Sequence, residues 1–504
     1  MTSGTPERGA PDEPDVVVVG SGPCAAIAAT ELVQLGLRVT MLDAGASAPR
    51  GALVRVRGNT VMRWVGSPME ADRHVALGDP RTEWFSSLSQ GGLSNYWTAA
   101  VPRLHPLDFS EGAGLDERYR WPITYEDLEP YYALVERRMG VTAGEAQPGV
   151  PANVRTFPRR QPHDWMELAE RLRGAGHSMG ALPMAAGRPT MAARRPTGWN
   201  SYHCLVKQLL HEPRFTLQRG AQVIRLEWSG PHGAVRAVEY LDRATGERRR
   251  LACRTVVLAA GTIDSTRILL QSRSADFPDG LGNTDGVLGR YLHDHPKEWW
   301  PARLNRPMTL LAHPMYVARA EHGVDSPLMA SSFTIGMVGR STRVRAWYGG
   351  TSDLVGVQVF GTMVPTEDHR VQLAPGDDAS TAPLRLDIRY DDQAVANMAA
   401  ARDRFRSVFA AAGLEAAPQG PFYDAVPGIS VHYAGSVRMH ADRRYGVLDA
   451  WNRIYDVPNV VVSDMSCFPT GPEKNPTLTA MAIAARAAHR LAADLGAGRL
   501  VSAA

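Results

Sequence analysis

Residues 15–43 constrain the fold of this chain more than any other segment. A β-branched run at residues 15–19 leads into a glycine-containing turn, and a helical stretch over residues 26–35 follows. A second apolar run then occupies residues 37–43. Strand, turn, helix and strand in about 30 residues form a βαβ unit. This unit predicts a parallel sheet with helices packed on its faces.

The turn has the spacing of a dinucleotide-binding loop. Gly20 allows the tight turn, Gly22 lets the backbone approach a pyrophosphate, and Ala25 permits close packing of the helix. The start of that helix then faces the phosphates. Asp43 ends the second strand, where an acid binds ribose hydroxyls. We predict a nucleotide cofactor; the alternative is an ordinary tight turn, and the pattern does not separate FAD from NAD.

The order of further signals predicts two structural units. Strand patterns occur at residues 215–217, 223–228 and 255–260, and strand signals return from residue 429 before an alanine-rich helix at 477–495. Residues 300–390 alternate as in an antiparallel sheet. The predicted fold class is α/β (α+β): a Rossmann-type domain with an inserted antiparallel-sheet domain. The predicted boundaries are a disordered tail at 1–14, a first domain of 15–294 plus 426–504 with a loop or lid near 141–163, and an insertion at 295–425.

Composition excludes several classes of function. The net charge is +3 with 21% charged residues, so no electrostatic feature indicates nucleic-acid binding. No apolar run is long enough to span a membrane, and residues 1–14 lack the apolar core of a signal peptide. The four cysteines are too scattered to bind zinc as a pair. We expect a cytoplasmic protein without a metal site.

The C-terminal third carries the most specific motifs. They are His432-Tyr433-Ala434-Gly435-Ser436-Val437-Arg438-Met439, Val457-Pro458-Asn459-Val460-Val461-Val462-Ser463-Asp464, Phe468-Pro469-Thr470 and Asn475-Pro476-Thr477-Leu478-Thr479. Three further patches lie at residues 91–95, 257–270 and 289–296. Together, in this order, they resemble the glucose–methanol–choline (GMC) oxidoreductase family, nearest its pyranose oxidase and bacterial glycoside oxidase branch. The resemblance implies FAD, a Rossmann-type FAD domain and a sheet-based substrate domain.

The resemblance implies two catalytic residues. His432 is the base that removes the hydroxyl proton, and Asn475 donates to the substrate oxygen where other branches carry a second histidine. The alternatives are a buried, satisfied histidine and an asparagine that caps the final helix. His293-Asp294-His295 looks like a metal cluster, but the family turn at 289–296 explains it better.

The resemblance also assigns a set of cofactor-binding residues. Asp464 has the alternative role of capping a turn, and Trp97 that of a core aromatic residue. Tyr96 stands where related enzymes carry the histidine that links the flavin, so we predict noncovalent FAD. Besides the turn and Asp43, the cofactor-binding residues are Gly92, Ser94, Asn95, Trp97, Thr98, Val223, Ala260, Gly261, Asp464, Pro476 and Thr477.

The implied activity is oxidation of an alcohol to a ketone or aldehyde by hydride transfer to flavin. The expected substrate is a small-molecule sugar, glycoside or sugar-bearing natural product, and the acceptor is O2 or a quinone-type compound. Oxidation of a non-sugar alcohol and a non-redox FAD-containing lyase remain alternatives. The oligomeric state is open, and Trp299 and Trp300 either line the substrate cavity or fill the core.

Overall fold

The computed structural model describes most of the chain. The predicted tail at 1–14 lies almost entirely outside the described residues, as does part of the predicted loop at 141–163. The described residues are 13–56, 59–65, 73–143, 151–154, 157–158, 161–185, 199–230, 233–311, 313–317, 328, 330–336, 350–375, 382–420 and 425–498.

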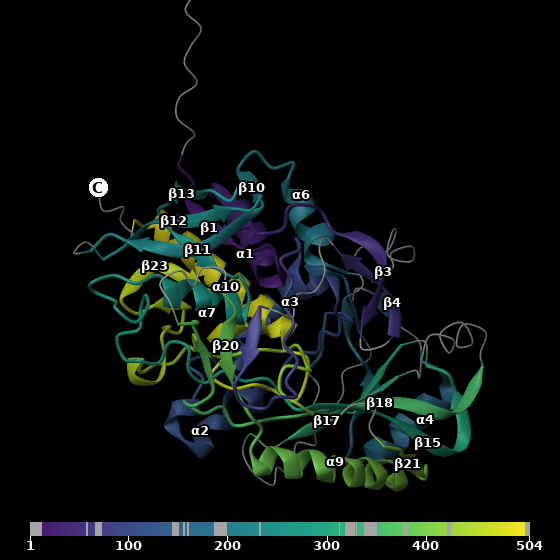
Figure 1. The fold of residues 1–504 in the computed structure, drawn as a ribbon. Coiled ribbons are helices and arrows are strands. Elements are labelled where there is room, and N and C mark those ends of the chain that lie inside the picture. The colour runs from purple at the N-terminus through teal and green to yellow at the C-terminus, as the bar shows by residue number, and fades with distance from the viewer. Residues whose placement is uncertain are drawn as a thin grey trace, which may run out of the picture.

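A six-stranded sheet forms the centre of the first unit (Figure 1). Its strands pair in parallel except for β22. All four valines of β1 are buried, as expected for a parallel strand covered on both faces. The Rossmann-type prediction is therefore confirmed. In spatial order the strands are β10 (Phe215–Arg219), β2 (Val39–Asp43), β1 (Val16–Val19), β14 (Val256–Leu258), β23 (Val457–Val462) and β22 (Arg453–Ile454).

Three helices pack in series beside this sheet, and α1 contacts its strands. Helix α1 (Pro23–Gln34) contacts α10 (Thr477–Gly496), which in turn contacts α3 (Tyr125–Met139). Figure 1 shows α1 and α10 in the middle of the molecule. Helix α10 begins next to Asn475 and α1 begins at the glycine turn, so the contact joins two helices that follow distant motifs.

Smaller elements complete the first unit. Helix α7 (Thr262–Gln271) follows β14, and an antiparallel sheet contains β11 (Ala221–Trp228), β12 (Val235–Asp242) and β13 (Arg248–Ala252). Residues 46–80 also carry strands. They contain a hairpin of β3 (Arg50–Val56) and β4 (Asn59–Val65), and then β5 (His74–Ala76). Arginine and glycine residues interrupt the alternation of apolar and polar residues that would predict strands in this segment.

The second unit is a six-stranded antiparallel sheet. One edge strand, β8, comes from before residue 294 and pairs with β16. The sheet therefore takes a strand from outside the predicted insertion at 295–425. Its spatial order is β21 (Ala416–Pro418), β15 (Lys297–Thr309), β18 (Thr351–Gly361), β17 (Ser331–Gly336), β16 (Met315–Val317) and β8 (Met179–Ala181).

Helices α4 (His163–Gly174) and α9 (Asp392–Ala411) supply the apolar cover of this sheet. Figure 1 shows α9 running along one side of it. Trp300 is fully buried in that core, with its ring centroid 5.1 Å from that of Phe405. Trp300 therefore fills the core. Because side chains alternate along a strand, Trp299 belongs to the opposite face.

That opposite face meets the C-terminal segment of the first unit. Lys297 pairs with Phe360, and Phe360 pairs with Ser332, so these three side chains form a row across β15, β18 and β17. The Ser332 hydroxyl donates to the Glu473 carbonyl oxygen over 2.6 Å. This row places the second sheet directly against the residues that precede Asn475.

The remaining elements are short connections. Among the described residues, no helix is both long and apolar enough to cross a lipid bilayer. These elements are η1 (Gly92–Asn95), η2 (Pro106–Phe109), α2 (Gly112–Leu115), η3 (Glu117–Tyr119), β6 (Val141–Ala143), β7 (Phe157–Pro158), β9 (Met184–Ala185), η4 (Tyr202–Val206), α6 (Lys207–Leu209), β19 (Arg370–Gln372), β20 (Leu384–Asp387), η5 (Arg443–Tyr445) and η6 (Met465–Cys467).

Candidate active site

His432 and Asn475 lie together where the two units meet. Nδ2 of Asn475 is 3.3 Å from Nε2 of His432. Helix α10 has Pro476 at its N-cap and no side-chain cap, so Asn475 does not cap it. Both His432 and Asn475 keep part of their surface accessible to solvent. The geometry thus favours the site role of Asn475 over the capping role.

A second imidazole holds the other side of the His432 ring. Nε2 of His295 lies 2.6 Å from Nδ1 of His432, and Nδ1 of His295 lies 2.7 Å from the carbonyl oxygen of Pro472. Burial lowers the pKa of His295 to about 4. Burial is the main cause that holds the pKa of His432 well below its usual range, and the nearby Lys297 charge acts in the same direction. Both rings are therefore neutral at neutral pH.

Asp294 fixes the turn that presents His432. Its carboxylate accepts from the backbone N–H of Gly428 over 2.9 Å, from the N–H of His432 over 3.3 Å, and from the Ser430 hydroxyl. Val431 adopts φ +60°, which is strained for a β-branched residue and costs on the order of 1–3 kcal/mol. The carboxylate clamp offsets this cost.

His293 completes the histidine-rich turn as a packing residue. Its Nδ1 lies 2.9 Å from the Tyr291 carbonyl oxygen, and a Cβ on Gly435 would approach Nδ1 to 2.7 Å. His293, Asp294 and His295 thus point to different partners. Within the described ranges, no group of three or more histidine, cysteine or acidic residues is arranged to hold a metal ion.

A buried charge cluster lies immediately before Asn475. Nζ of Lys474 is 2.8 Å from Asp108 Oδ2 and 2.8 Å from Glu473 Oε1. Burial raises the pKa of Asp108 to about 6. Burial alone would lower the pKa of Lys474, but the charges of Asp108 and Glu473 outweigh it and raise that pKa. No sequence motif signalled this cluster, because Asp108 is distant in the chain and belongs to no recognised pattern.

The glycine turn, Asp43 and the loop at 91–95 form one cradle. The Ser21 hydroxyl donates to Asp43 over 2.6 Å and accepts from the N–H of Gly91 over 2.8 Å. The N–H of Gly45 donates to the other Asp43 oxygen over 2.8 Å. Burial raises the pKa of Asp43 to about 6. Two of the acceptor positions of Asp43 are used in this way, which leaves others for ribose hydroxyls.

The shape of the cradle fits a dinucleotide. A Cβ on Gly22 would meet nothing within 4 Å, and a Cβ on Gly92 would lie 3.7 Å from Cα of Gly22. Helix α1, where Ala25 is fully buried, begins without a side-chain cap. In the described part of the chain, the buried Oδ1 of Asn95 has no hydrogen-bond partner. Open space at Gly22, an uncapped helix start and an unsatisfied amide oxygen are the features that bound FAD would use.

The other predicted cofactor residues differ in their burial, their hydrogen bonds and their position in the fold. Ser94 is buried and donates to the Gly91 carbonyl oxygen over 2.6 Å. Trp97 donates through Nε1 to the Trp199 carbonyl oxygen over 2.9 Å, and Thr98 is exposed. The rest lie at the ends of elements or in a strand. Val223 is a buried residue of β11, Ala260 and Gly261 join β14 to α7, and Pro476 and Thr477 begin α10.

The Asp464 carboxylate holds its own turn and the start of α7 together through hydrogen bonds. One carboxylate oxygen accepts from Gly261 N–H over 3.0 Å and from the Ser265 hydroxyl over 2.5 Å. The other accepts from the N–H and hydroxyl of Ser466 over 2.9 and 2.6 Å. A carboxylate has about four acceptor positions, and all are taken. The role of Asp464 in FAD binding stays a prediction, and its carboxylate is already hydrogen-bonded within the protein.

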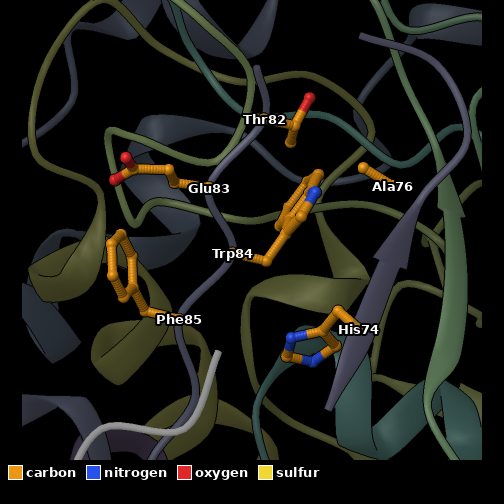
Figure 2. Close-up of a pocket in the computed structure, with 6 residues that line it drawn as sticks. All are labelled: His74, Ala76, Thr82, Glu83, Trp84 and Phe85. Carbon is orange, nitrogen blue, oxygen red and sulfur yellow. The ribbon is translucent and has the colours of Figure 1, made fainter. Parts of the chain in front are cut away.

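A cavity of about 380 Å³ lies beside the His432 turn without including His432 or Asn475 (Figure 2). Figure 2 shows Trp84, His74 and Ala76 on one side of the segment, with Glu83 and Phe85 on the other. The Trp84 ring centroid is 4.7 Å from that of Tyr433. The cavity wall therefore contacts the residue that follows His432.

Comparison with known proteins identifies the family. A family model described as GMC oxidoreductase matches residues 365–484. The chain is 31% identical to 6'''-hydroxyparomomycin C oxidase of Streptomyces lividus, covering 96% of this chain and 92% of that one. It is 29% identical to paromamine 6'-oxidase of Streptomyces fradiae, covering 95% and 92%.

Solved structures share the fold. An FAD-dependent oxidoreductase from Chaetomium thermophilum superposes with a TM-score of 0.66 at 12% identity, covering 97% of this chain and 100% of that one. Pyridoxine 4-oxidase from Mesorbium loti gives a TM-score of 0.61 at 18% identity, covering 95% and 99%. The chain belongs to the GMC oxidoreductase family, whose enzymes act on CH–OH groups. The expected family and its cofactor, FAD, are confirmed.

Proposed function

We propose that this enzyme oxidises a hydroxyl group of a sugar, a glycoside or a sugar-bearing natural product to an aldehyde or ketone. The observation that carries the proposal is the pair of His432 and Asn475, 3.3 Å apart at the seam between the two units. The named activities of the two Streptomyces relatives support an amino-sugar compound as the first substrate class to test.

His432 has the properties of a general base. Its ring is neutral at neutral pH because its pKa lies well below the usual range. Asn475 presents an amide donor beside the same nitrogen, where it would bind the substrate oxygen as negative charge develops. Bound FAD supplies the acceptor for the hydride that leaves the same carbon. The protein itself orients the alcohol and removes the hydroxyl proton.

We infer that the FAD is held without a covalent bond, by the cradle around Gly22, Asp43 and the loop at 91–95. Tyr96 supports this inference, because it replaces the histidine that links the flavin in related enzymes. Acid precipitation of the purified protein should release all of the yellow colour into the supernatant. Colour that stays in the pellet would contradict noncovalent binding.

The decisive experiment is anaerobic mixing of the yellow enzyme with four groups of compounds: sugars, O- and C-glycosides, aminoglycosides and simple alcohols. Loss of the flavin absorbance with one group identifies the substrate class. Readmitting O2 or adding a quinone then identifies the electron acceptor. If dithionite bleaches the flavin but no compound does, the sugar proposal fails and a non-redox lyase becomes the leading explanation.

A non-sugar alcohol is the second candidate. The chain is 27% identical to 2-methyl-1,2-propanediol dehydrogenase of Mycolicibacterium austroafricanum over 94% of its length. The simple alcohols in the panel test this candidate directly.

We also propose a reducing compartment, such as the cytoplasm, because all four cysteines are buried and unpaired.

A further inference from the structure

The hydrogen-bond chain behind His432 determines where its ring protons lie. A backbone carbonyl oxygen only accepts hydrogen bonds. Nδ1 of His295 lies 2.7 Å from the carbonyl oxygen of Pro472, so this nitrogen must carry the proton. In a neutral imidazole the other nitrogen is then an acceptor. Nε2 of His295 therefore presents a lone pair to His432.

The same argument continues one ring further. Nε2 of His295 is 2.6 Å from Nδ1 of His432, so Nδ1 of His432 must be the donor. Nε2 of His432 is left with a lone pair, and it is the nitrogen 3.3 Å from the donor Nδ2 of Asn475. We infer that His295 is a positioning residue that fixes His432 in the tautomer whose Nε2 is free to accept a proton. This inference rests on the proposed function of His432.

The alternative proton arrangements are unfavourable. A proton on Nε2 of His295 instead would leave the lone pair of Nδ1 facing the Pro472 carbonyl oxygen at 2.7 Å. A proton on both nitrogens would place a cation in a fully buried ring. Lys297, on β15, opposes such a cation, while Glu473, in the segment after Pro472, favours it. Burial has the largest effect on the pKa of His295 and keeps its ring neutral.

The arrangement also supports the protonated base. When the substrate hydroxyl gives its proton to Nε2, His432 becomes an imidazolium and keeps its proton on Nδ1. That N–H then donates to the lone pair of His295, which makes a charge-assisted hydrogen bond. Phe360 limits movement of both rings, with its centroid 5.1 Å from that of His295 and 6.2 Å from that of His432.

The chain offers a matched pair of variants at His295. In His295→Gln the amide nitrogen can donate to Pro472 while the amide oxygen accepts from His432. In His295→Leu neither bond can form. Hydrogen-bond partners that orient metal-ligating histidines are typically worth about 10- to 100-fold, and we expect a similar factor for this ring. Flavin reduction by the substrate should therefore slow by about that factor in the leucine variant and stay within a few-fold of wild type in the glutamine variant. Equal losses in both variants would overturn the inference.

A second measurement does not depend on turnover. In the FAD-loaded enzyme labelled with ¹⁵N-histidine, long-range proton–nitrogen correlations report the tautomer of each ring. Signals that vanish in His432→Gln belong to His432, and they should show a proton on Nδ1 alone. A proton on Nε2 would overturn the inference even if the leucine variant fails to fold. If no compound reduces the flavin but this tautomer is observed, the proposed function fails while the positioning role stands.

Discussion

Lys474 and Asp108 are separated by 366 positions in the sequence, yet Nζ and Oδ2 lie 2.8 Å apart. Asp108 also accepts from the backbone N–H of His105 over 2.7 Å. This contact ties the loop before α10 to η2, and Lys474 is followed directly by Asn475. The position of one proposed catalytic residue therefore depends on an ion pair that takes no part in the chemistry.

Replacing Lys474 with methionine should lower the free energy of unfolding by about 3–5 kcal/mol, because Asp108 and Glu473 would stay buried without their cation. The loss should be smaller at pH 5 than at pH 8, since protonation removes the uncompensated charge. Denaturant unfolding measures both values. Arg406→Ala, which breaks an exposed ion pair with Asp403, serves as the control with a change of less than about 1 kcal/mol. A loss below that value for Lys474→Met would contradict the structural role.

His432→Ala should keep its FAD and slow flavin reduction about 10²- to 10⁴-fold, because the proton acceptor is removed. Stopped-flow absorbance measures the rate, and the ratio of flavin to protein absorbance measures the FAD content. His211 is exposed and distant in the sequence from the site segments, so His211→Ala should reduce at the wild-type rate. Unchanged reduction in His432→Ala would show that another group is the base.

Asn475→Asp should shift the pH profile as well as the rate. A carboxylate next to Nε2 of His432 favours the imidazolium and raises the pKa of that ring. Because the base must be neutral, the acid limb of kcat/KM should move to higher pH. Asn475→Ala introduces no charge and should lower the rate about 10²- to 10³-fold without this shift. A common acid limb in both variants would exclude close contact between the two side chains.

Two glycines of the same turn should respond differently to alanine. A Cβ on Gly20 would lie 2.7 Å from the Ala259 carbonyl oxygen at φ +97°, so Gly20→Ala should destabilise the apoprotein. A Cβ on Gly22 meets nothing within 4 Å and φ is −61°, so the Gly22→Ala apoprotein should be as stable as wild type. Its FAD affinity should fall, because the pyrophosphate would occupy that space. Wild-type FAD affinity in Gly22→Ala, measured by fluorescence titration, would place the cofactor elsewhere.

Buried histidines should make the enzyme sensitive to acid. Burial lowers the pKa of His369 to about 4, from an unfolded value near 6.5. Between these values the unfolded chain binds more protons, so this residue makes stability fall as the pH falls from about 6.5 to about 4. His369→Gln removes one titrating group. As the pH falls from about 6.5 to about 4, the urea concentration at the unfolding midpoint should therefore decrease less in His369→Gln than in the wild type. An equal decrease in both proteins would contradict the prediction.

Local patterns in the sequence predicted the elements whose signals are contiguous. The valine run at β1, the turn at Gly20 and Gly22, and Asp43 lie in one short segment, and the structure brings them together as expected. His432 and Asn475 were predicted only through resemblance to a family, because no local spacing relates them. Their contact arises from the packing of separate loops.

Three features depend on tertiary contacts that no local pattern encodes. The pairing of Asp108 with Lys474 joins two loops with no shared motif. The two tryptophans at 299 and 300 look alike in sequence, and only the register of β15 sends one into the core. The four hydrogen bonds on the Asp464 carboxylate come from Gly261, Ser265 and Ser466, and the first two are distant in the chain, so the sequence could not show that this carboxylate is occupied.

The origin of β8 limits how the second unit of this enzyme can be exchanged with that of a relative. A chimera that replaced residues 295–425 alone would separate β16 from its edge partner β8. It would also pair foreign strands with the native α4, whose Trp165 is fully buried in the core of the second sheet. A graft must therefore include residues 163–181 as a second piece, because these residues supply both α4 and β8.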